Sequence, residues 1–146
     1  MTWNKIRIKP ADKLFSNYIR EKADWKCQKC GKLCRLNGEW IARLEASHYF
    51  SRSHGGTRYD EQNVYSLCGS CHKRMGGYTP SENREYDLWV KEMLGTDYTK
   101  LKIRAKSYYK RDEKLDLLFV KQLIKQKYGN SRTIKNRRRT SLSNYR

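Results

Sequence analysis

The sequence predicts a small α+β protein in which short strands and two cysteine pairs form a core flanked by helices. Three observations indicate this class. Cysteines occur in two Cys-x-x-Cys pairs, Cys27–Cys30 and Cys68–Cys71, and Asn37-Gly38 is a dipeptide typical of tight β-hairpins. Apolar residues also recur at helical spacing near both ends of the chain. A chain of 146 residues suffices for one such domain but not for two.

The composition is strongly basic, with 33 Lys and Arg against 15 Asp and Glu and a formal net charge of +18. No fold requires this excess, which creates a field that attracts polyanions, above all nucleic acid. An anionic membrane is the competing partner, but the sequence has no long apolar run and no basic amphipathic helix with a strong apolar face. We therefore expect nucleic acid as the partner and no membrane association.

The N-terminal stretch MTWNKIRIKPADK lacks the apolar segment of a secretory signal. Five cysteines without an export signal indicate a reducing cytosol, where Cys-x-x-Cys pairs bind metal more often than they form disulfides. We expect a cytoplasmic protein.

Local signals predict the elements of the first half of the chain. Residues 1–10 are basic and end at a proline, which is typical of an arm or a first strand. Residues 11–23 show helical spacing, with an acid in the first turn where the helix dipole favours it. We expect a strand over residues 40–49 with His48 near its end, a turn at 54–57, and a helix or short crossing segment over 60–67.

The second half reads as helical. Residues 68–74 hold the second cysteine pair and open into a helix, and Thr79-Pro80-Ser81-Glu82 is a capping box for another helix, which Gly95 ends. A further helix is expected from about Glu113 to Tyr128. Its predicted buried side consists of Leu115, Leu118, Phe119, Ile124 and Tyr128.

These elements predict one domain over residues 1–130, with a core at about 25–76 and a helical part at about 79–130. Residues 131–146 are basic and almost without apolar side chains, so we expect this tail to stay disordered until it meets a polyanion.

The two cysteine pairs can supply four thiolates to one tetrahedral zinc ion. A small basic domain with a modest core gains folding free energy from such a site. We therefore expect Cys27, Cys30, Cys68 and Cys71 to bind a structural Zn²⁺. Cys34 has no partner at a matching spacing; it is either a bystander or a replacement for one of the four ligands.

All three histidines lie in the stretch from Glu45 to Arg74, beside the second cysteine pair. The order His48, Gly55-Gly56-Thr57, Asn63 and Cys68-Gly69-Ser70-Cys71-His72 resembles the HNH endonuclease motif. The resemblance implies a zinc-braced ββα-metal core of the treble-clef type, in which a hairpin and a helix surround one catalytic divalent ion.

A wider resemblance, to the NinG recombination proteins of lambdoid phages, runs from about Leu14 to Arg74. Its residues are Tyr18-Ile19-Arg20-Glu21, the first cysteine pair, Glu45-Ala46-Ser47-His48-Tyr49 and Thr57-Arg58-Tyr59-Asp60-Glu61-Gln62-Asn63-Val64. It implies a nuclease acting in phage DNA recombination, on duplex or branched DNA, in the cytoplasm of a bacterial host. Cutting both strands would favour a homodimer, and the sequence leaves the oligomeric state open.

The resemblance also implies roles for single residues. His48 would be the general base that activates water, His72 a ligand of a catalytic Mg²⁺ or Mn²⁺, and Asn63 the residue that orients His48 or the hairpin. Many HNH proteins have Asp immediately before the base, where this chain has Ser47. The nearest acid is Glu45, which on a regular strand points away from His48 and would reach the metal only through a bulge. His54 and Asp60 are the other candidate ligands.

Basic side chains near this motif are candidates for phosphate contacts, because guanidinium groups bind phosphate through two hydrogen bonds. They are Arg52, Arg58, Lys73 and Arg74, with Arg137, Arg138 and Arg139 in the tail.

Each assignment has a plainer alternative. His48 can be an ordinary strand histidine, His72 a neighbour of the zinc site or a helix cap, and Asn63 a helix N-cap. At the level of function the alternatives are a zinc-containing nucleic-acid-binding protein without catalysis, and a basic RNA-binding or ribosome-associated zinc protein. The absence of Asp before His48 keeps the first of these open, and the second explains the charge and the cysteines but not the placement of the histidines and Asn63. Catalysis explains more of the sequence.

Overall fold

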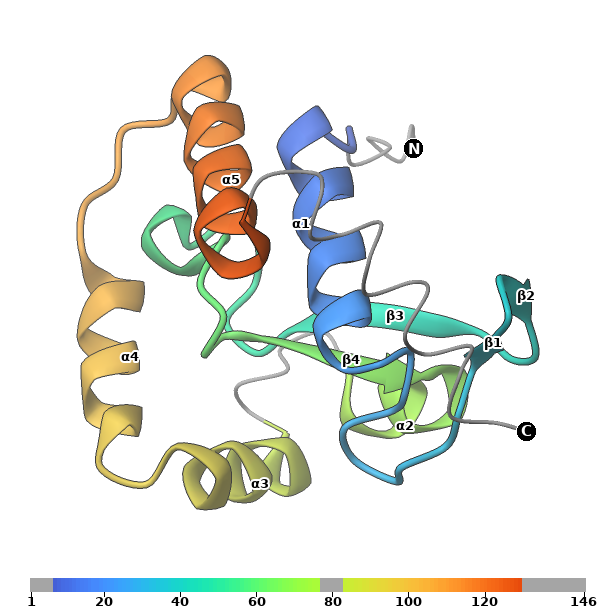
Figure 1. Ribbon diagram of the computed structural model, residues 1–146. Helices are drawn as coiled ribbons and strands as arrows, with labels where there is room; N and C mark the ends of the chain where they lie inside the picture. The colour runs from blue at the N-terminus through green and yellow to red at the C-terminus, as the bar shows by residue number, and fades with distance from the viewer. Residues whose placement is uncertain (1–6, 77–82, 130–146) are drawn as a thin grey trace, which may run out of the picture.

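The structure is a computed structural model that describes residues 7–76 and 83–129 (Figure 1). Within these residues it has helices and two small antiparallel sheets, so the α+β class is confirmed. The elements follow one another as α1 (Pro10–Lys22), β1 (Arg35–Leu36), β2 (Glu39–Trp40), β3 (Leu44–His48), the 3-10 helix η1 (Gly55–Thr57), β4 (Val64–Cys68), α2 (Gly69–Met75), α3 (Arg84–Leu94), α4 (Asp97–Lys106) and α5 (Glu113–Tyr128).

Helix α1 forms where its apolar spacing predicts. Pro10 occupies the first turn, where its missing N–H is not needed, and the Asp12 carboxylate accepts a hydrogen bond of 2.9 Å from the Lys9 amide. The helix buries Phe15, Tyr18 and Ile19 against the rest of the chain. Residues 1–6 lie outside the described part, so the N-terminal arm or strand stays a prediction.

The first hairpin confirms the Asn37-Gly38 signal. Asn37 and Gly38 have φ values of 52° and 84°, as a type I′ turn requires, and Arg35 pairs with Trp40. The strand expected over residues 40–49 is, however, interrupted between β2 and β3. The amides of Ile41 and Ala42 donate to the carbonyl of Cys34, at 2.8 and 3.2 Å, and so are taken out of the strand.

The hairpin β3–β4 lies at the centre of the molecule. It is antiparallel, with Leu44 opposite Cys68 and His48 opposite Val64, and its register has no bulge. The helix or crossing segment expected over 60–67 is therefore wrong: residues 64–68 form a strand. Every residue of β4 is buried because helices cover both faces of the hairpin, and burial on both faces removes the alternating pattern that marks a half-exposed strand.

Two apolar clusters hold the helices to this hairpin. Val64 faces a cluster built with α1 and α5, whereas Tyr65 and Leu67 face a second cluster built with α2, α3 and the cysteine pairs. Figure 1 shows α1 and α5 on one side of the hairpin and α2 and α3 on the other.

The loop between β3 and β4 contains η1, which replaces the hairpin turn expected at residues 54–57. Neither Gly55 nor Gly56 has a positive φ. A Cβ on Gly56 would lie 2.4 Å from the carbonyl oxygen of Arg104 at the end of α4, so this glycine is needed for the close approach of α4.

The C-terminal helices agree only partly with the prediction. Helix α3 begins at Arg84, where the Asn83 side chain accepts a hydrogen bond of 3.2 Å from the Tyr86 amide. It does not begin at Pro80, and the expected capping box lies outside the described residues. The two or three C-terminal helices expected from the sequence include a third, α4, whose position was not predicted. It buries only Leu101 and Ala105, one turn apart on a mostly charged helix.

Helix α5 has the predicted bounds but a different buried face. Leu115, Leu118 and Phe119 are 61, 61 and 54 % exposed, which contradicts the expectation that they are buried. Asp116 and Val120 are buried instead, with Leu117, Leu123, Ile124 and Tyr128 packed toward α1. Apolar residues occur all round this helix, so its pattern does not select a face, and packing on α1 does. The tail over residues 131–146 lies outside the described part of the chain.

Among the described helices, none combines the length and the apolar composition needed to cross a bilayer.

Candidate active site and metal centre

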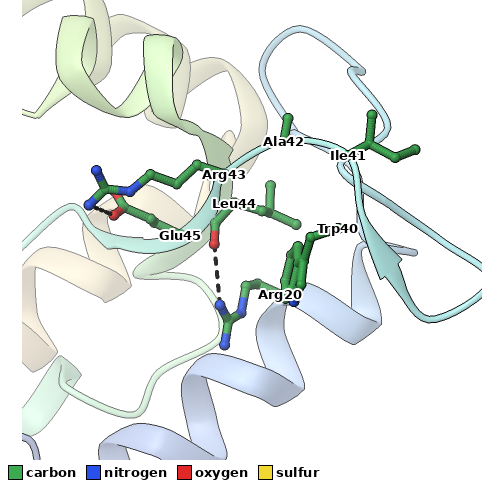
Figure 2. A pocket seen from close by; sticks show the side chains of 7 residues that line it. All are labelled: Arg20, Trp40, Ile41, Ala42, Arg43, Leu44 and Glu45. Carbon is green, nitrogen blue, oxygen red and sulfur yellow. Dashed lines mark hydrogen bonds and ion pairs between the residues drawn. The ribbon is translucent and has the colours of Figure 1, made fainter.

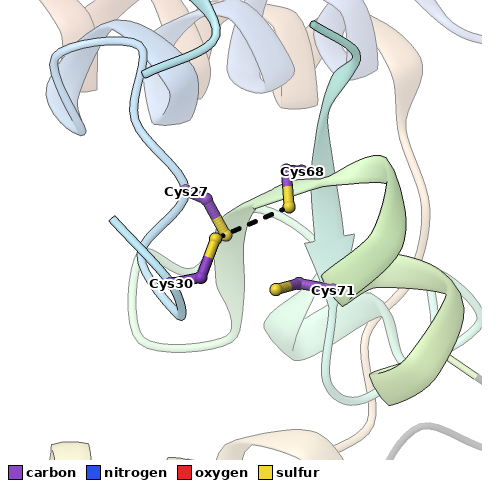
Figure 3. Close-up of side chains that lie close together, drawn as sticks. All are labelled: Cys27, Cys30, Cys68 and Cys71. Atoms are coloured by element: carbon purple, nitrogen blue, oxygen red, sulfur yellow. Dashed lines mark hydrogen bonds between the residues drawn. The ribbon is translucent and has the colours of Figure 1, made fainter. Parts of the chain in front are cut away.

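The four cysteines of the two pairs converge on one point, as expected. Their sulfur atoms all lie within 4.8 Å of one another, and the Sγ atoms of Cys30 and Cys68 are 3.7 Å apart (Figure 3). Zinc–sulfur bonds of about 2.3 Å in a tetrahedron place the sulfurs about 3.8 Å apart, so the donor set fits zinc. All five cysteines are free thiols, and Cys34 is buried outside this group of four.

The electrostatics of the group favour a bound cation. Burial raises the pKa of Cys68, but hydrogen bonds with the Ser70 hydroxyl and the Cys71 backbone outweigh it and lower this pKa to about 6. Burial and hydrogen bonds with the other three cysteines raise the pKa of Cys71 far above its usual value. Four thiolates this close repel one another, and a dication removes that repulsion.

Glu45 and His72 form a second pair of potential metal ligands. The Nδ1 atom of His72, on α2, is in direct contact with a carboxylate oxygen of Glu45, on β3. The other carboxylate oxygen contacts the exposed guanidinium of Arg43. Burial raises the pKa of Glu45, but these contacts with His72 and Arg43 outweigh it, and the pKa lies below its usual value.

This contact does not need a strand bulge. Glu45 lies opposite Leu67, whose side chain is in the cluster covered by α2, so Glu45 faces α2 on a regular strand. His48 lies opposite Val64 on the other face, so the structure does not bring Glu45 and His48 together directly. The carboxylate and the imidazole are partly exposed, at 27 and 35 %, which leaves room for water and phosphate as further ligands.

His48 is half-buried and held by one backbone hydrogen bond. Its Nε2 atom lies 3.0 Å from the carbonyl oxygen of Arg58. A carbonyl can only accept, so the proton of the neutral ring sits on Nε2 and the Nδ1 lone pair is left to accept a proton. Burial, with smaller contributions from the charges of Arg52 and Arg58, lowers the pKa of His48 to about 4.

Asn63 fixes the loop between β3 and β4. Its side chain is completely buried and makes three hydrogen bonds: it accepts from the Phe50 amide at 2.8 Å and donates to the carbonyls of Phe50 and Thr57, both at 2.9 Å. The Asn63 carbonyl also accepts from the Tyr49 amide at 2.9 Å, next to His48. Asn63 therefore organises the loop rather than contacting a ligand, and it caps no helix in the described chain.

The expectation that Arg58 contacts phosphate is not met, because its guanidinium is buried and binds Asp12. It is 5 % exposed, and its Nε and Nη2 atoms donate to the two carboxylate oxygens of Asp12 at 2.7 and 2.5 Å. Burial raises the pKa of Asp12, but Arg58, the Lys9 amide and Tyr59 outweigh it and lower this pKa to about 2. The guanidinium is thus used inside the fold, because α1 packs over the loop that carries it.

The remaining basic candidates stay near the surface. Lys73 and Arg74 are exposed on α2, and Arg74 pairs with Glu85 at 3.1 Å. Arg52 is half-buried in the loop, and the tail arginines lie outside the described residues. Sequence reasoning missed Arg43, which is 77 % exposed beside Glu45; its position two residues before Glu45, at the start of a strand, is the signal that points to it.

The other two candidate ligands have different partners. Asp60 pairs with Arg104 at 2.6 Å, and His54 is exposed, with its Nδ1 3.3 Å from the Ser51 hydroxyl. Within the described chain the four cysteines are the one cluster of three or more His, Cys, Asp or Glu ligands, so a second metal would have Glu45 and His72 as its protein ligands.

The match to known families agrees with this arrangement. The HNH endonuclease family model matches residues 27–77, about a third of the chain. This segment includes both cysteine pairs, Glu45, His48, Asn63 and His72. The chain thus has the fold class of a small α+β protein with an HNH domain, and such a domain implies a nucleic-acid substrate. No curated protein and no solved structure matches the chain.

Proposed function

We propose that this protein is a DNA endonuclease that hydrolyses phosphodiester bonds with His48 as the general base. One observation carries the proposal. Strand β3 lies inside the segment that matches the HNH model and holds both His48 and Glu45. The Nε2 atom of His48 donates to a carbonyl, which leaves its Nδ1 atom to accept a proton, and the Glu45 carboxylate contacts His72.

The chemistry of His48 follows from its hydrogen bond. Because Nε2 donates to the Arg58 carbonyl, Nδ1 accepts the proton of the attacking water as its oxygen bonds to phosphorus. The bond from phosphorus to the 3′ oxygen breaks, which leaves a 5′-phosphate end. The carbonyl of Arg58 then stabilises the imidazolium that forms.

Glu45 and His72 would hold the catalytic ion. A carboxylate suits Mg²⁺ and Mn²⁺, and an imidazole beside it suits Mn²⁺ better than Mg²⁺. Such an ion, when bound, neutralises the scissile phosphate and stabilises the leaving oxygen.

We place the substrate along the free edge of β3. In the described chain β3 pairs with β4 along one edge only. A phosphate placed along the free edge can be approached from both faces, by Glu45 and His72 on one side and by His48 on the other. Arg43, Lys73 and Arg74 are exposed near this edge or on α2, where they can contact flanking phosphates.

Cleavage of supercoiled plasmid and of a synthetic four-way junction tests the proposal, with Mg²⁺, with Mn²⁺ and without added divalent ion. We expect metal-dependent cutting that His48→Ala lowers by about a hundredfold or more, the typical contribution of a general base. His54→Ala is the matched control, because His54 lies in the same loop region but is exposed and outside the site.

The comparison requires that each variant keeps its zinc content and its affinity for DNA. Equal activity of both histidine variants would contradict the assignment of His48. Tight binding without cutting under any metal would leave a zinc-containing nucleic-acid-binding protein.

The finer biological role rests on the resemblance to the NinG proteins. We propose on that basis a part in phage DNA recombination within a bacterial cytoplasm, with branched DNA as one substrate. The preference between plasmid and junction in the same assay tests the substrate, and the dependence of the rate on protein concentration tests whether a homodimer acts.

A further inference from the structure

An open groove leads directly to the proposed metal site. It runs along residues 40–45, from the first hairpin into β3, with Arg20 of α1 on its other side, and its volume is about 530 Å³ (Figure 2). Glu45 ends the groove, and its carboxylate contacts His72. A molecule in this groove therefore lies beside the group that would hold the catalytic ion.

The hairpin end of the groove exposes large apolar side chains. Leu36, Trp40 and Ile41 are 51, 52 and 59 % exposed and lie close together in the sequence. Adjacent exposed apolar residues on a protein with a net charge of +18 are typical of a binding surface.

Trp40 is half-exposed but held in place. Its ring lies edge-to-face against that of Trp25, with centroids 5.6 Å apart. The guanidinium of Arg35 lies 4.5 Å from the Trp25 ring and 5.1 Å from the Trp40 ring, and that of Arg20 lies 5.7 Å from Trp40. A rigid aromatic ring with a solvent-facing part loses little conformational entropy when a ligand stacks on it.

The charges around the groove favour an anion. Arg43 is 77 % exposed on its wall, where it also contacts the Glu45 carboxylate. Arg20 is anchored to the carbonyls of Ser16 and Leu44, both at 3.2 Å. The guanidinium groups of Arg20 and Arg35 lie 5.7 and 5.1 Å from the same Trp40 ring, so two positive groups lie close together here. A bound phosphate would relieve this repulsion.

A ligand that combines a flat apolar ring with a phosphate is a nucleotide. In a continuous duplex the faces of the bases are stacked on one another and cannot reach an indole ring, whereas an unpaired base can. We propose that this groove binds an unpaired nucleotide next to the scissile phosphate, with its base against Trp40 and its phosphate near Arg43. The inference rests on the proposed nuclease function and makes DNA with an unpaired nucleotide at the cleavage site the preferred substrate.

Binding measurements in the His48→Ala background, without added divalent ion, test the groove apart from catalysis. The probes are a fluorescein-labelled duplex and the same duplex carrying a single-stranded flap. We expect tighter binding of the flap substrate, and a loss of about tenfold in its affinity on Trp40→Ala with little change for the duplex. Trp40→Phe should keep most of the preference because it keeps a stacking ring.

Phe119→Ala is the control, since Phe119 is equally exposed, at 54 %, but lies on α5 away from this groove. Zinc content and circular dichroism establish that each variant is folded. An equal loss for both probes, or no loss for either, would overturn the proposed groove. Flap-selective binding that depends on Trp40, in a wild-type protein that cuts no substrate, would support the groove and overturn the nuclease.

Discussion

At the scale of single residues, the backbone decides what His48 can do. Its Nε2 atom donates to the Arg58 carbonyl, and burial favours the neutral ring, so the Nδ1 atom stays unprotonated over a wide pH range. Asp12 supports this arrangement indirectly: it binds the guanidinium of Arg58, and the backbone carbonyl of Arg58 accepts the hydrogen bond from His48. Asp12 is thus a positioning residue rather than a helix cap alone.

The lowered pKa of His48 predicts how activity depends on pH. Because the pKa in the folded protein is about 4 instead of 6.5, the ring stays neutral at pH values where a free histidine is protonated. We expect kcat/KM for cleavage to show no decline near pH 6.5 and to fall only as the pH approaches the lowered pKa. Initial rates on plasmid across this range measure the profile, and an acidic limb centred on 6.5 would contradict it.

The same shift affects stability in the same window. Between pH 6.5 and about 4 the unfolded chain binds a proton at this histidine and the folded protein does not, so stability is lost as the pH falls. Circular dichroism at each pH must therefore accompany the rates.

At the scale of elements, the loop between β3 and β4 is the part that joins fold and site. It holds His48 through Arg58, it carries η1, and it is tied at both ends by the side chain of Asn63. Helix α4 packs on it through Gly56, and Arg104 donates to Asp60 and Gln62, both at 2.6 Å. A loop with this many internal partners has a defined conformation, as the loop of the proposed active site requires.

Asn63→Ala should destabilise the protein by roughly 3 kcal/mol, because it leaves the buried carbonyl of Thr57 and the partly buried amide and carbonyl of Phe50 without partners. Urea unfolding of the zinc-loaded protein measures the loss. The control is Asn83→Ala, which removes the N-cap of α3 and should destabilise by about 1 kcal/mol. Equal losses in the two variants would contradict the view that Asn63 organises the loop.

At the scale of the whole molecule, many of the acidic residues are paired with basic residues of the same chain. Ion pairs engage Asp12, Glu45, Asp60, Glu61, Glu85, Asp87, Asp97 and Glu113 with basic partners. With 33 basic residues against 15 acidic ones, most basic side chains are left for solvent or a polyanion. Binding to DNA should accordingly weaken as salt rises.

Metal removal tests how much of the molecule depends on the four cysteines, which join the segment before β1 to the end of β4 and to α2. We expect one zinc ion per chain, and chelation should abolish cooperative unfolding of the core.

Cys71→Ala should lose the zinc. Cys34→Ala should keep it, since Cys34 is equally buried but outside the group. Elemental analysis of both variants measures this, and loss of zinc from Cys34→Ala would make Cys34 a ligand.

The sequence by itself determined the features that depend on near neighbours in the chain. Local conformational preference predicts the Asn37-Gly38 turn, α1 and the bounds of α5. The fixed spacing of metal ligands predicts that the two Cys-x-x-Cys pairs form one site. Strand β4 is buried on both faces, so it has no alternating pattern that marks it as a strand. The position of helix α4 is not evident from the sequence because only two of its residues are buried, which leaves no clear helical periodicity.

Only the tertiary structure decided which side chains meet. That Glu45 reaches His72 depends on the register of β3 against β4 and on the packing of α2 over one face. That the Arg58 guanidinium binds Asp12, and so is not available for a phosphate, depends on α1 packing against a loop 46 residues further along the chain. Such contacts join residues far apart in sequence. Local pattern cannot specify them, because the free energy that selects them comes from burying apolar surface and pairing charges across the whole fold.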